Sequence, residues 1–143
     1  MNKRFIIAVL SGFLILSACG SKKPPAVVET MGPVPVTELK TIYYDFDDSS
    51  IRDDQVDTLL SNAAVLKDGN YNATVEGHCD ERGTNEYNLA LGDRRARSSK
   101  DYLINLGVDP SKLSVSSYGE ERPVCMEHDE SCWWQNRRAQ FLK

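Results

Sequence analysis

One short run in the chain, His78-Cys79-Asp80, has side chains that could do chemistry, and a second histidine stands at position 128. Histidine, cysteine and aspartate are all metal-ligand types. The run ends a segment that predicts a strand, however, and neighbouring strand residues point to opposite faces, so His78 and Cys79 would not converge on one ion. No spacing pairs a serine or cysteine with a base and an orienting group, and none of the 21 acidic residues is singled out for glycosidase chemistry. We therefore predict no metal, no cofactor and no catalysis.

The pattern of apolar residues predicts the elements that would position this run. Residues 41–46, which read Thr-Ile-Tyr-Tyr-Asp-Phe, are β-branched and aromatic and predict a first strand. Apolar residues recur at helical spacing over 56–66, until an Asp-Gly-Asn sequence stops that helix. Residues 71–78 alternate and predict a second strand. A third strand is expected over 112–118 and, after an irregular loop, a fourth over 138–143.

A long helix is expected over residues 85–106, with Gly107 closing it in the C′ position. Its buried stripe steps by three and four residues and consists of Leu89, Gly92, Ala96, Ser99, Leu103 and Leu106. The small members of this stripe would let the helix lie close on a sheet. The element order predicts an α/β fold, specifically an α+β sandwich in which two helices pack on a small mixed sheet.

The N-terminus predicts a cleaved signal peptide over residues 1–18. A short basic start is followed by an apolar run over 5–16, which is shorter than the roughly 20 residues of a membrane-spanning helix. The sequence Leu-Ser-Ala-Cys, ending at Cys19, resembles the lipobox of bacterial lipoproteins. That resemblance implies three acyl chains on Cys19, which would anchor firmly, and Gly20 implies sorting to the outer membrane. An uncleaved anchor is the alternative.

A linker and one folded domain would follow. Residues 19–40 hold four of the six prolines and predict an extended tether, with a reach of roughly 60 Å in polyproline II. The folded domain is expected over 41–143. Without its first eighteen residues the chain has 15 basic against 21 acidic residues, which argues against nucleic acid as a partner.

The cysteines after position 19 suggest one disulfide. Cys125 and Cys132 bracket an eight-residue stretch, and in an oxidising compartment this spacing favours a local bridge. Closing eight residues corresponds to at most about 2.5 kcal/mol of stabilisation. Cys79 is expected to remain a buried free thiol, because the neighbouring Asp80 disfavours its thiolate. A bridge that involves Cys79 is the alternative.

Three blocks of sequence carry a resemblance to a known family. They read Tyr-Tyr-Asp-Phe-Asp from residue 43, Gly-His-Cys-Asp-Glu-Arg-Gly-Thr-Asn-Glu-Tyr-Asn from residue 77 with Leu-Gly-Asp-Arg-Arg-Ala from residue 91, and Ser-Tyr-Gly-Glu-Glu-Arg-Pro with a later Asn-Arg-Arg-Ala. Together they resemble the peptidoglycan-associated lipoproteins, a branch of the OmpA-C-like family, over about residues 42–141. The resemblance implies non-covalent binding of peptidoglycan, attachment of the outer membrane to the wall, and a role in envelope integrity and cell division within a Tol-Pal system that includes TolB.

The resemblance also implies a ligand, the meso-diaminopimelate of the peptidoglycan stem peptide, whose free end is a zwitterion. Asp80 matches the family's ammonium-binding aspartate, and Arg95 matches its carboxylate-binding arginine, whose planar fork binds a carboxylate bidentately. The other residues expected at this peptidoglycan site are Phe46, Asp47, Asn88, Leu91 and Arg138.

Helical geometry agrees with that assignment. Asn88, Leu91 and Arg95 share a helix face, and side chains lean toward the helix N-terminus, so Arg95 should reach back toward the Asp80 loop. Arg94 should face elsewhere. The Cys125–Cys132 bridge is expected to hold its loop without touching the Asp80–Arg95 pair.

Simpler interpretations stay open at this point. Asp80 could cap a turn, and Arg95 could pair with Asp93 or Glu86 at the surface, where such pairs contribute little. Phe46 could pack in the core, and Asp47 could cap the first helix. A lipoprotein enzyme that cuts the wall and uses the same fold to hold its substrate is the alternative function.

Overall fold

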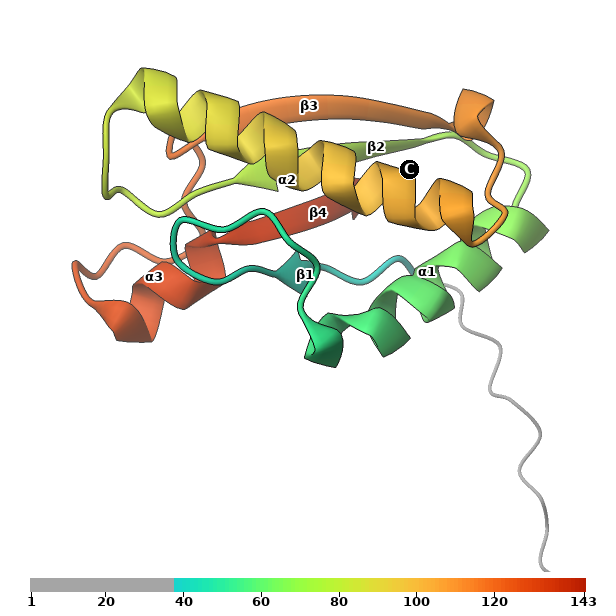
Figure 1. The fold of residues 1–143 in the computed structure, drawn as a ribbon, viewed down its shortest axis with the longest axis horizontal. Helices are drawn as coiled ribbons and strands as arrows, with labels where there is room; N and C mark the ends of the chain where they lie inside the picture. The colour runs from blue at the N-terminus through green and yellow to red at the C-terminus, as the bar shows by residue number, and fades with distance from the viewer. Residues whose placement is uncertain (1–37) are drawn as a thin grey trace, which may run out of the picture. The chain divides into compact units, whose positions relative to one another are not determined.

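The four strands form one mixed sheet in the order β1-β4-β2-β3 (Figure 1). The computed structural model describes residues 38–143, so the expected signal peptide, the lipidated cysteine and most of the expected linker lie outside the described residues. β2 (Ala73–His78) pairs in parallel with β3 (Leu113–Gly119) and antiparallel with β4 (Arg138–Leu142). The other edge of β4 pairs antiparallel with the short β1 (Ile42–Tyr43). The prediction of a small mixed sheet is confirmed.

Two helices, α1 (Val56–Asp68) and α2 (Asn85–Asn105), cover one face of this sheet and enclose the core (Figure 1). Val75 in β2 stands beside Phe141 in β4, and both side chains are buried in the core as the two-residue period of a strand requires. From the helices the core receives Leu59, Ala63, Leu66, Ala96 and Leu103. Burial of these apolar side chains between the two layers is the main source of stability.

Two glycines set how closely α2 approaches the sheet. A Cβ atom on Gly77 of β2 would lie 1.8 Å from the carbonyl oxygen of Gly92 in α2, and one on Gly92 would lie 2.4 Å from Ser117 Oγ. Neither position can therefore carry a side chain without moving the helix. The expectation that small residues let the long helix lie close on the sheet is confirmed, and this close contact fixes the height of the α2 side chains above β2.

Near the start of the described residues, two hydrogen bonds hold the backbone of Lys40 to α1. The buried Asn62 side chain accepts a hydrogen bond from Lys40 N at 2.8 Å and donates one to Lys40 O at 2.8 Å. Leu39 packs against the core beside it. The folded part therefore begins before the strand that marks its expected boundary. Two short 3-10 turns, Asp53–Gln55 and Pro110–Lys112, lead into α1 and β3.

The structure differs from expectation in two elements, the segment before β4 and the length of β1. A third helix, α3 (Glu130–Asn136), lies where an irregular loop was expected. Its apolar pattern is weak, and it is held by a disulfide and by an Asp129 cap, whose Oδ1 accepts from Ser131 N at 2.8 Å. β1 is two residues long because the chain leaves the sheet after Tyr44, and Asp47 then adopts a left-handed φ of 54°.

Candidate functional site

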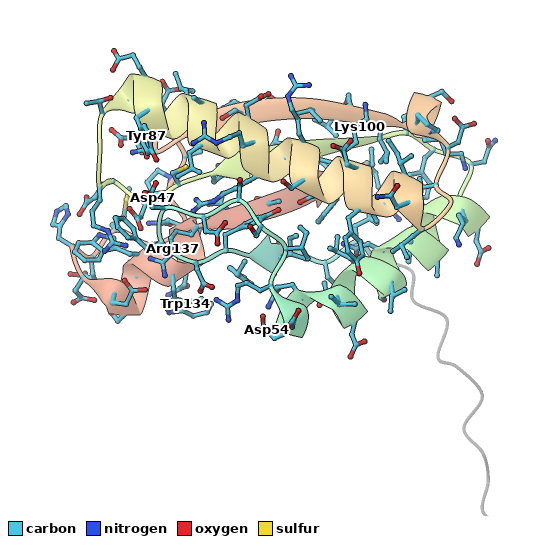
Figure 2. The ribbon with its side chains drawn as sticks, in the orientation of Figure 1. Asp47, Asp54, Tyr87, Lys100, Trp134 and Arg137 are labelled. Carbon is cyan, nitrogen blue, oxygen red and sulfur yellow. A yellow bond between two sulfur atoms is a disulfide. The ribbon has the colours of Figure 1, made fainter. Side chains whose placement is uncertain are left out.

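A cavity of about 210 Å³ opens where the end of β1, the loop after β2 and the first turns of α2 meet. Figure 2 shows Asp47, Tyr87 and Arg137 gathered at this end of the molecule. The cavity brings together six of the seven residues that were expected at the peptidoglycan site, namely Phe46, Asp47, Asp80, Asn88, Leu91 and Arg95. Residues distant in sequence therefore form one small concave surface.

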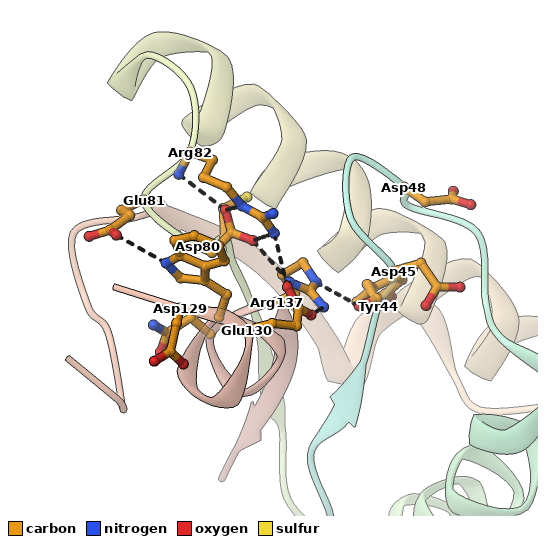
Figure 3. A network of polar contacts seen from close by, with 12 residues as sticks. Tyr44, Asp45, Asp48, Asp80, Glu81, Arg82, Asp129, Glu130 and Arg137 are labelled. Atoms are coloured by element: carbon orange, nitrogen blue, oxygen red, sulfur yellow. Dashed lines mark hydrogen bonds and ion pairs between the residues drawn. The ribbon is translucent and has the colours of Figure 1, made fainter. Parts of the chain in front are cut away.

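The carboxylate of Asp80 lies between two arginines (Figure 3). Arg82 donates to it from its backbone N at 3.1 Å, from Nε at 3.2 Å and from Nη2 at 2.6 Å, and Arg137 Nη1 donates at 3.1 Å. Burial raises the pKa of Asp80, but these hydrogen bonds outweigh it, and the pKa lies below its usual range. Asp80 is therefore a fixed, ionised carboxylate. The alternative that Asp80 caps a turn also holds, because its Oδ1 accepts the hydrogen bond from the backbone N of Arg82.

Arg95 is fully buried and connects two segments of backbone. Its Nε donates to Asp48 O at 2.8 Å, Nη2 to Asp45 O at 2.9 Å, and Nη1 to His78 O at 2.9 Å and to Cys79 Sγ at 3.4 Å. Burial lowers the pKa of its guanidinium. Since a guanidinium has five N–H bonds, one hydrogen on Nη2 is left for a ligand.

Arg95 therefore reaches back toward the β2–α2 loop, as helical geometry predicted. The alternative of a surface pair with Asp93 or Glu86 does not hold, because Arg95 is fully buried and none of its hydrogen bonds goes to either carboxylate, while Asp93 pairs with Arg97 at 2.6 Å. The neighbouring Arg94 is exposed and lies 5.8 Å from the ring centre of Tyr87.

The rim of the cavity is aromatic and acidic. Phe46 is 56% exposed, which excludes the alternative that it packs in the core. Asp47 accepts a hydrogen bond from the hydroxyl of Tyr87 and does not cap α1, whose N-cap residue is Gln55. Ligand groups entering the cavity would pass these side chains.

Asn88 and Leu91 form the inner wall, about two turns and one turn before Arg95 on α2 respectively. Asn88 Nδ2 donates to Asp80 O at 3.2 Å and to Glu120 Oε2 at 2.5 Å, so its amide holds the loop that carries Asp80. Leu91 is 4% exposed and supplies an apolar surface.

Arg138, the seventh expected residue, does not line the cavity. It lies on β4, where its Nη2 donates to Arg122 O at 3.2 Å. Its neighbour Arg137 lines the cavity instead and donates to Tyr44 O at 3.2 Å as well as to Asp80. Both arginines stand in one motif, and only the position of β4 relative to Asp80 tells them apart.

Sequence reasoning also did not identify Arg82 and Tyr87 as cavity residues. Arg82 stands two residues after Asp80, a spacing at which a side chain can fold back on an Asp that caps its own turn. That spacing was the available signal.

The cysteines are paired as the spacing suggested. Cys125 and Cys132 form a disulfide, and Cys79 is a buried free thiol. Burial raises the pKa of the Cys79 thiol to about 11, with Asp80 as a lesser contribution in the same direction.

The bridged segment contacts the side chains around Asp80, although among the described residues no hydrogen bond or ion pair joins it to Asp80 or Arg95 themselves. Glu130, inside the bridged segment, accepts from both Nη atoms of Arg137 and lies 3.5 Å from Arg82 Nη2. Both arginines hold Asp80. The segment therefore contacts the site because α3 brings one of its side chains back over β4.

Two properties of residues 38–143 bear on other classes of site. No group of three or more His, Cys, Asp or Glu side chains in this range is arranged to hold a metal ion. None of the helices in this range is both long and apolar enough to cross a membrane.

Comparison with known proteins gives the same fold and close sequence relatives. Residues 43–131 match the OmpA family. A peptidoglycan-associated lipoprotein of Mesorhizobium japonicum is 43% identical, across 97% of this chain and 91% of the relative. One of Rhizobium meliloti is 54% identical across 68% of this chain, and the chain spans 56% of that relative's length. The crystal structure of the peptidoglycan-associated lipoprotein from Burkholderia pseudomallei superimposes with a TM-score of 0.69 at 42% identity, covering 71% of this chain and 87% of that one.

These matches extend over the strands and helices that build the cavity, including β1, β2, α2 and β3. The chain therefore belongs to the OmpA family and, within it, to the peptidoglycan-associated lipoproteins.

Proposed function

We propose that this chain is a lipid-anchored protein of the outer membrane that binds peptidoglycan non-covalently through the meso-diaminopimelate of its stem peptides. The observation that carries the proposal is the cavity in which an ionised carboxylate, Asp80, lies beside guanidinium groups. The relatives that bear the name peptidoglycan-associated lipoprotein support it.

The charges of the cavity complement a zwitterion. The free end of meso-diaminopimelate carries an ammonium and a carboxylate on one carbon. Asp80, whose pKa lies below its usual range, accepts from the ammonium at neutral pH. Arg95, with one unused Nη2 hydrogen, donates to the carboxylate. Leu91 and Phe46 cover the methylene chain between the two ends of the ligand.

The size of the cavity also suits one end of an amino acid. Its volume of about 210 Å³ lies below the roughly 300–1,000 Å³ of sites that enclose drug-sized ligands. A disaccharide of the glycan strand would not fit inside, so we assign the cavity to the stem peptide.

The anchor and the partners are part of the same proposal. Lipidation of Cys19 would attach the chain to the outer membrane, and the proline-rich residues 19–40 would span from there to the domain in the periplasm. Membership of the peptidoglycan-associated lipoproteins supports participation in a Tol-Pal system with TolB, and with it roles in envelope integrity and cell division.

The alternative of a wall-cutting enzyme has no support in the cavity. A general acid for glycoside hydrolysis needs a raised pKa, whereas Asp80 is paired with two arginines and its pKa is lowered. Release of muropeptides from purified sacculi by the purified chain would contradict the proposed binding role.

A pull-down with purified sacculi tests the proposal. The full chain in mild detergent should sediment with sacculi, and free meso-diaminopimelate should compete. Asp80→Asn removes the charge but keeps the shape of the side chain, and loss of one partner from a desolvated charge pair costs about 2–5 kcal/mol. The variant should therefore lose most binding, and the exposed control Arg94→Gln should not. An Asp80→Asn chain that unfolds cooperatively and still binds like the wild type would refute the assignment.

A further inference from the structure

Two adjacent tryptophans of α3 contact different parts of the molecule. The ring centre of Trp133 lies 4.2 Å from Cζ of Arg82, and the ring centre of Phe46 lies 3.9 Å from the same atom. Trp134 packs on Tyr43 instead, with ring centroids 5.2 Å apart. Arg82 is therefore stacked on two aromatic rings, one from the loop after β1 and one from α3, and such stacking fixes the plane of a guanidinium.

The stacked guanidinium has donors to spare. Arg82 uses Nε and Nη2 on Asp80, and its Nη1 has no hydrogen-bond partner among the described residues. Its side chain is 31% exposed and lines the cavity. Arg95, by contrast, is fully buried and retains a single hydrogen. Bidentate binding of a carboxylate needs two N–H groups, so Arg95 alone cannot provide it.

We infer that Arg82 is a second specificity-determining residue of the cavity beside Arg95, that it binds the ligand carboxylate through Nη1, and that Trp133 of α3 positions it for this contact. The inference rests on the proposed peptidoglycan site. Its consequence concerns the third residue of the stem peptide: a diaminopimelate end has a carboxylate beside its ammonium, and a lysine end has the ammonium alone. Arg82 and Trp133 would distinguish these two ends, whereas Asp80 serves both.

The contacts of α3 support a positioning role for Trp133. Its Nε1 donates to Glu81 Oε1 at 3.0 Å, which fixes the indole beside Arg82. Glu130 lies 3.5 Å from Arg82 Nη2 and also binds Arg137. A helix of seven residues has little stability of its own, and the Cys125–Cys132 bridge holds this one in place. The orientation of Arg82 therefore depends on α3.

Calorimetric titration with two synthetic stem tetrapeptides tests the inference. The peptides differ only at the third residue, which is meso-diaminopimelate in one and lysine in the other. The full chain in mild detergent should bind the diaminopimelate peptide more tightly. Arg82→Ala and Trp133→Leu should each lower the affinity for the diaminopimelate peptide by about tenfold and change the affinity for the lysine peptide by less than about twofold. Loss of a charged or stacked contact corresponds to about a tenfold change in the dissociation constant.

Matched variants separate positioning from general damage. Trp134→Leu removes the adjacent tryptophan, which does not contact Arg82, and should bind both peptides like the wild type. Trp133→Phe retains a ring and should recover most of the affinity for the diaminopimelate peptide. Arg82→Lys keeps a positive charge beside Asp80 but not the planar fork, and should lose most of the preference even where Arg82→Ala does not fold.

Three outcomes would overturn the inference. If the variants lose affinity for both peptides equally, Arg82 and Trp133 have a structural role only. If the affinity for the diaminopimelate peptide is unchanged, Arg82 does not contact its carboxylate. A wild-type chain that binds both peptides equally would lack the preference itself. Failure of the wild type to bind either peptide would instead refute the proposed function.

Discussion

Replacement of Arg95 by alanine should destabilise the fold as well as weaken the site. The guanidinium holds the backbone carbonyls of Asp45 and Asp48, in the segment after β1, against the carbonyl of His78 at the end of β2. Hydrogen bonds from a charged donor contribute about 1.5–3 kcal/mol each, so three of them set an upper range of about 4.5–9 kcal/mol. Burial of the guanidinium in the wild type also costs free energy, because it removes a charge from water, and the same burial lowers its pKa. We expect a net loss of about 3–5 kcal/mol, the usual cost of removing one partner from a buried charged network.

Urea unfolding followed by circular dichroism measures this loss. Arg94→Ala is the matched control, because Arg94 is the exposed neighbour and a surface substitution changes stability by less than about 0.5 kcal/mol. The Arg95→Ala chain should unfold at clearly lower urea concentration than either the control or the wild type. If its free energy of unfolding stays within about 1 kcal/mol of the control, Arg95 does not hold the two segments together and the reasoning fails.

Three further predictions concern the bridge, the pH dependence and the packing of α2. Reduction of the Cys125–Cys132 disulfide should lower the free energy of unfolding by at most about 2.5 kcal/mol. It should also lower the affinity for the diaminopimelate peptide several-fold. Unchanged affinity after complete reduction, checked by thiol titration, would contradict this. Because the pKa of Asp80 is lowered in the folded state, its ion pairs stabilise the protein above the ordinary carboxyl pKa and are lost as pH falls. The stability difference between wild type and Asp80→Asn should therefore be constant above about pH 5 and shrink toward about pH 2, and a difference that grows on acidification would contradict the assigned ion pairs. Gly77→Ala places a Cβ 1.8 Å from the backbone oxygen of Gly92, and calorimetric melting should show a loss of about 3 kcal/mol; a variant that melts with the wild type would show that α2 can shift freely.

The fold could be predicted from the sequence wherever a local pattern agrees with the final packing. The alternation of residues 71–78 and the stripe of small residues on α2 report burial directly, since both elements lie against the core with a regular period. α3 could not be predicted in this way. Only Cys132 and Asn136 of this helix are buried, and it is held by a disulfide and by side-chain bonds to the backbone of Val124 and Cys125. Such contacts have no sequence period.

In the candidate site, too, the residues placed by local helix geometry could be predicted, and those placed by the tertiary fold could not. Asp80 and Arg95 could be placed near one another because helix geometry sends the Arg95 side chain toward the Asp80 loop. The choice between Arg137 and Arg138 could not be made, because it depends on how β4 meets the end of β2. The part of α3 in the site was missed for the same reason: Glu130 reaches Arg137 only after the chain has turned back over the sheet.

In the proposed function the chain is held by an anchor at one end and by the wall at the other, and the two hydrogen bonds between Asn62 and the backbone of Lys40 then have a mechanical consequence. The described chain enters beside α1 and runs through β1 (Figure 1). Phe46 and Asp47, which follow β1, line the cavity. Tension between a wall fragment in the cavity and a pull from residue 38 would act along the direction of β1. The β1–β4 hydrogen bonds lie across this direction, so they would be sheared together rather than opened one by one. The two Asn62 bonds would carry the load before the strand does, which makes Asn62→Ala the substitution to test under force.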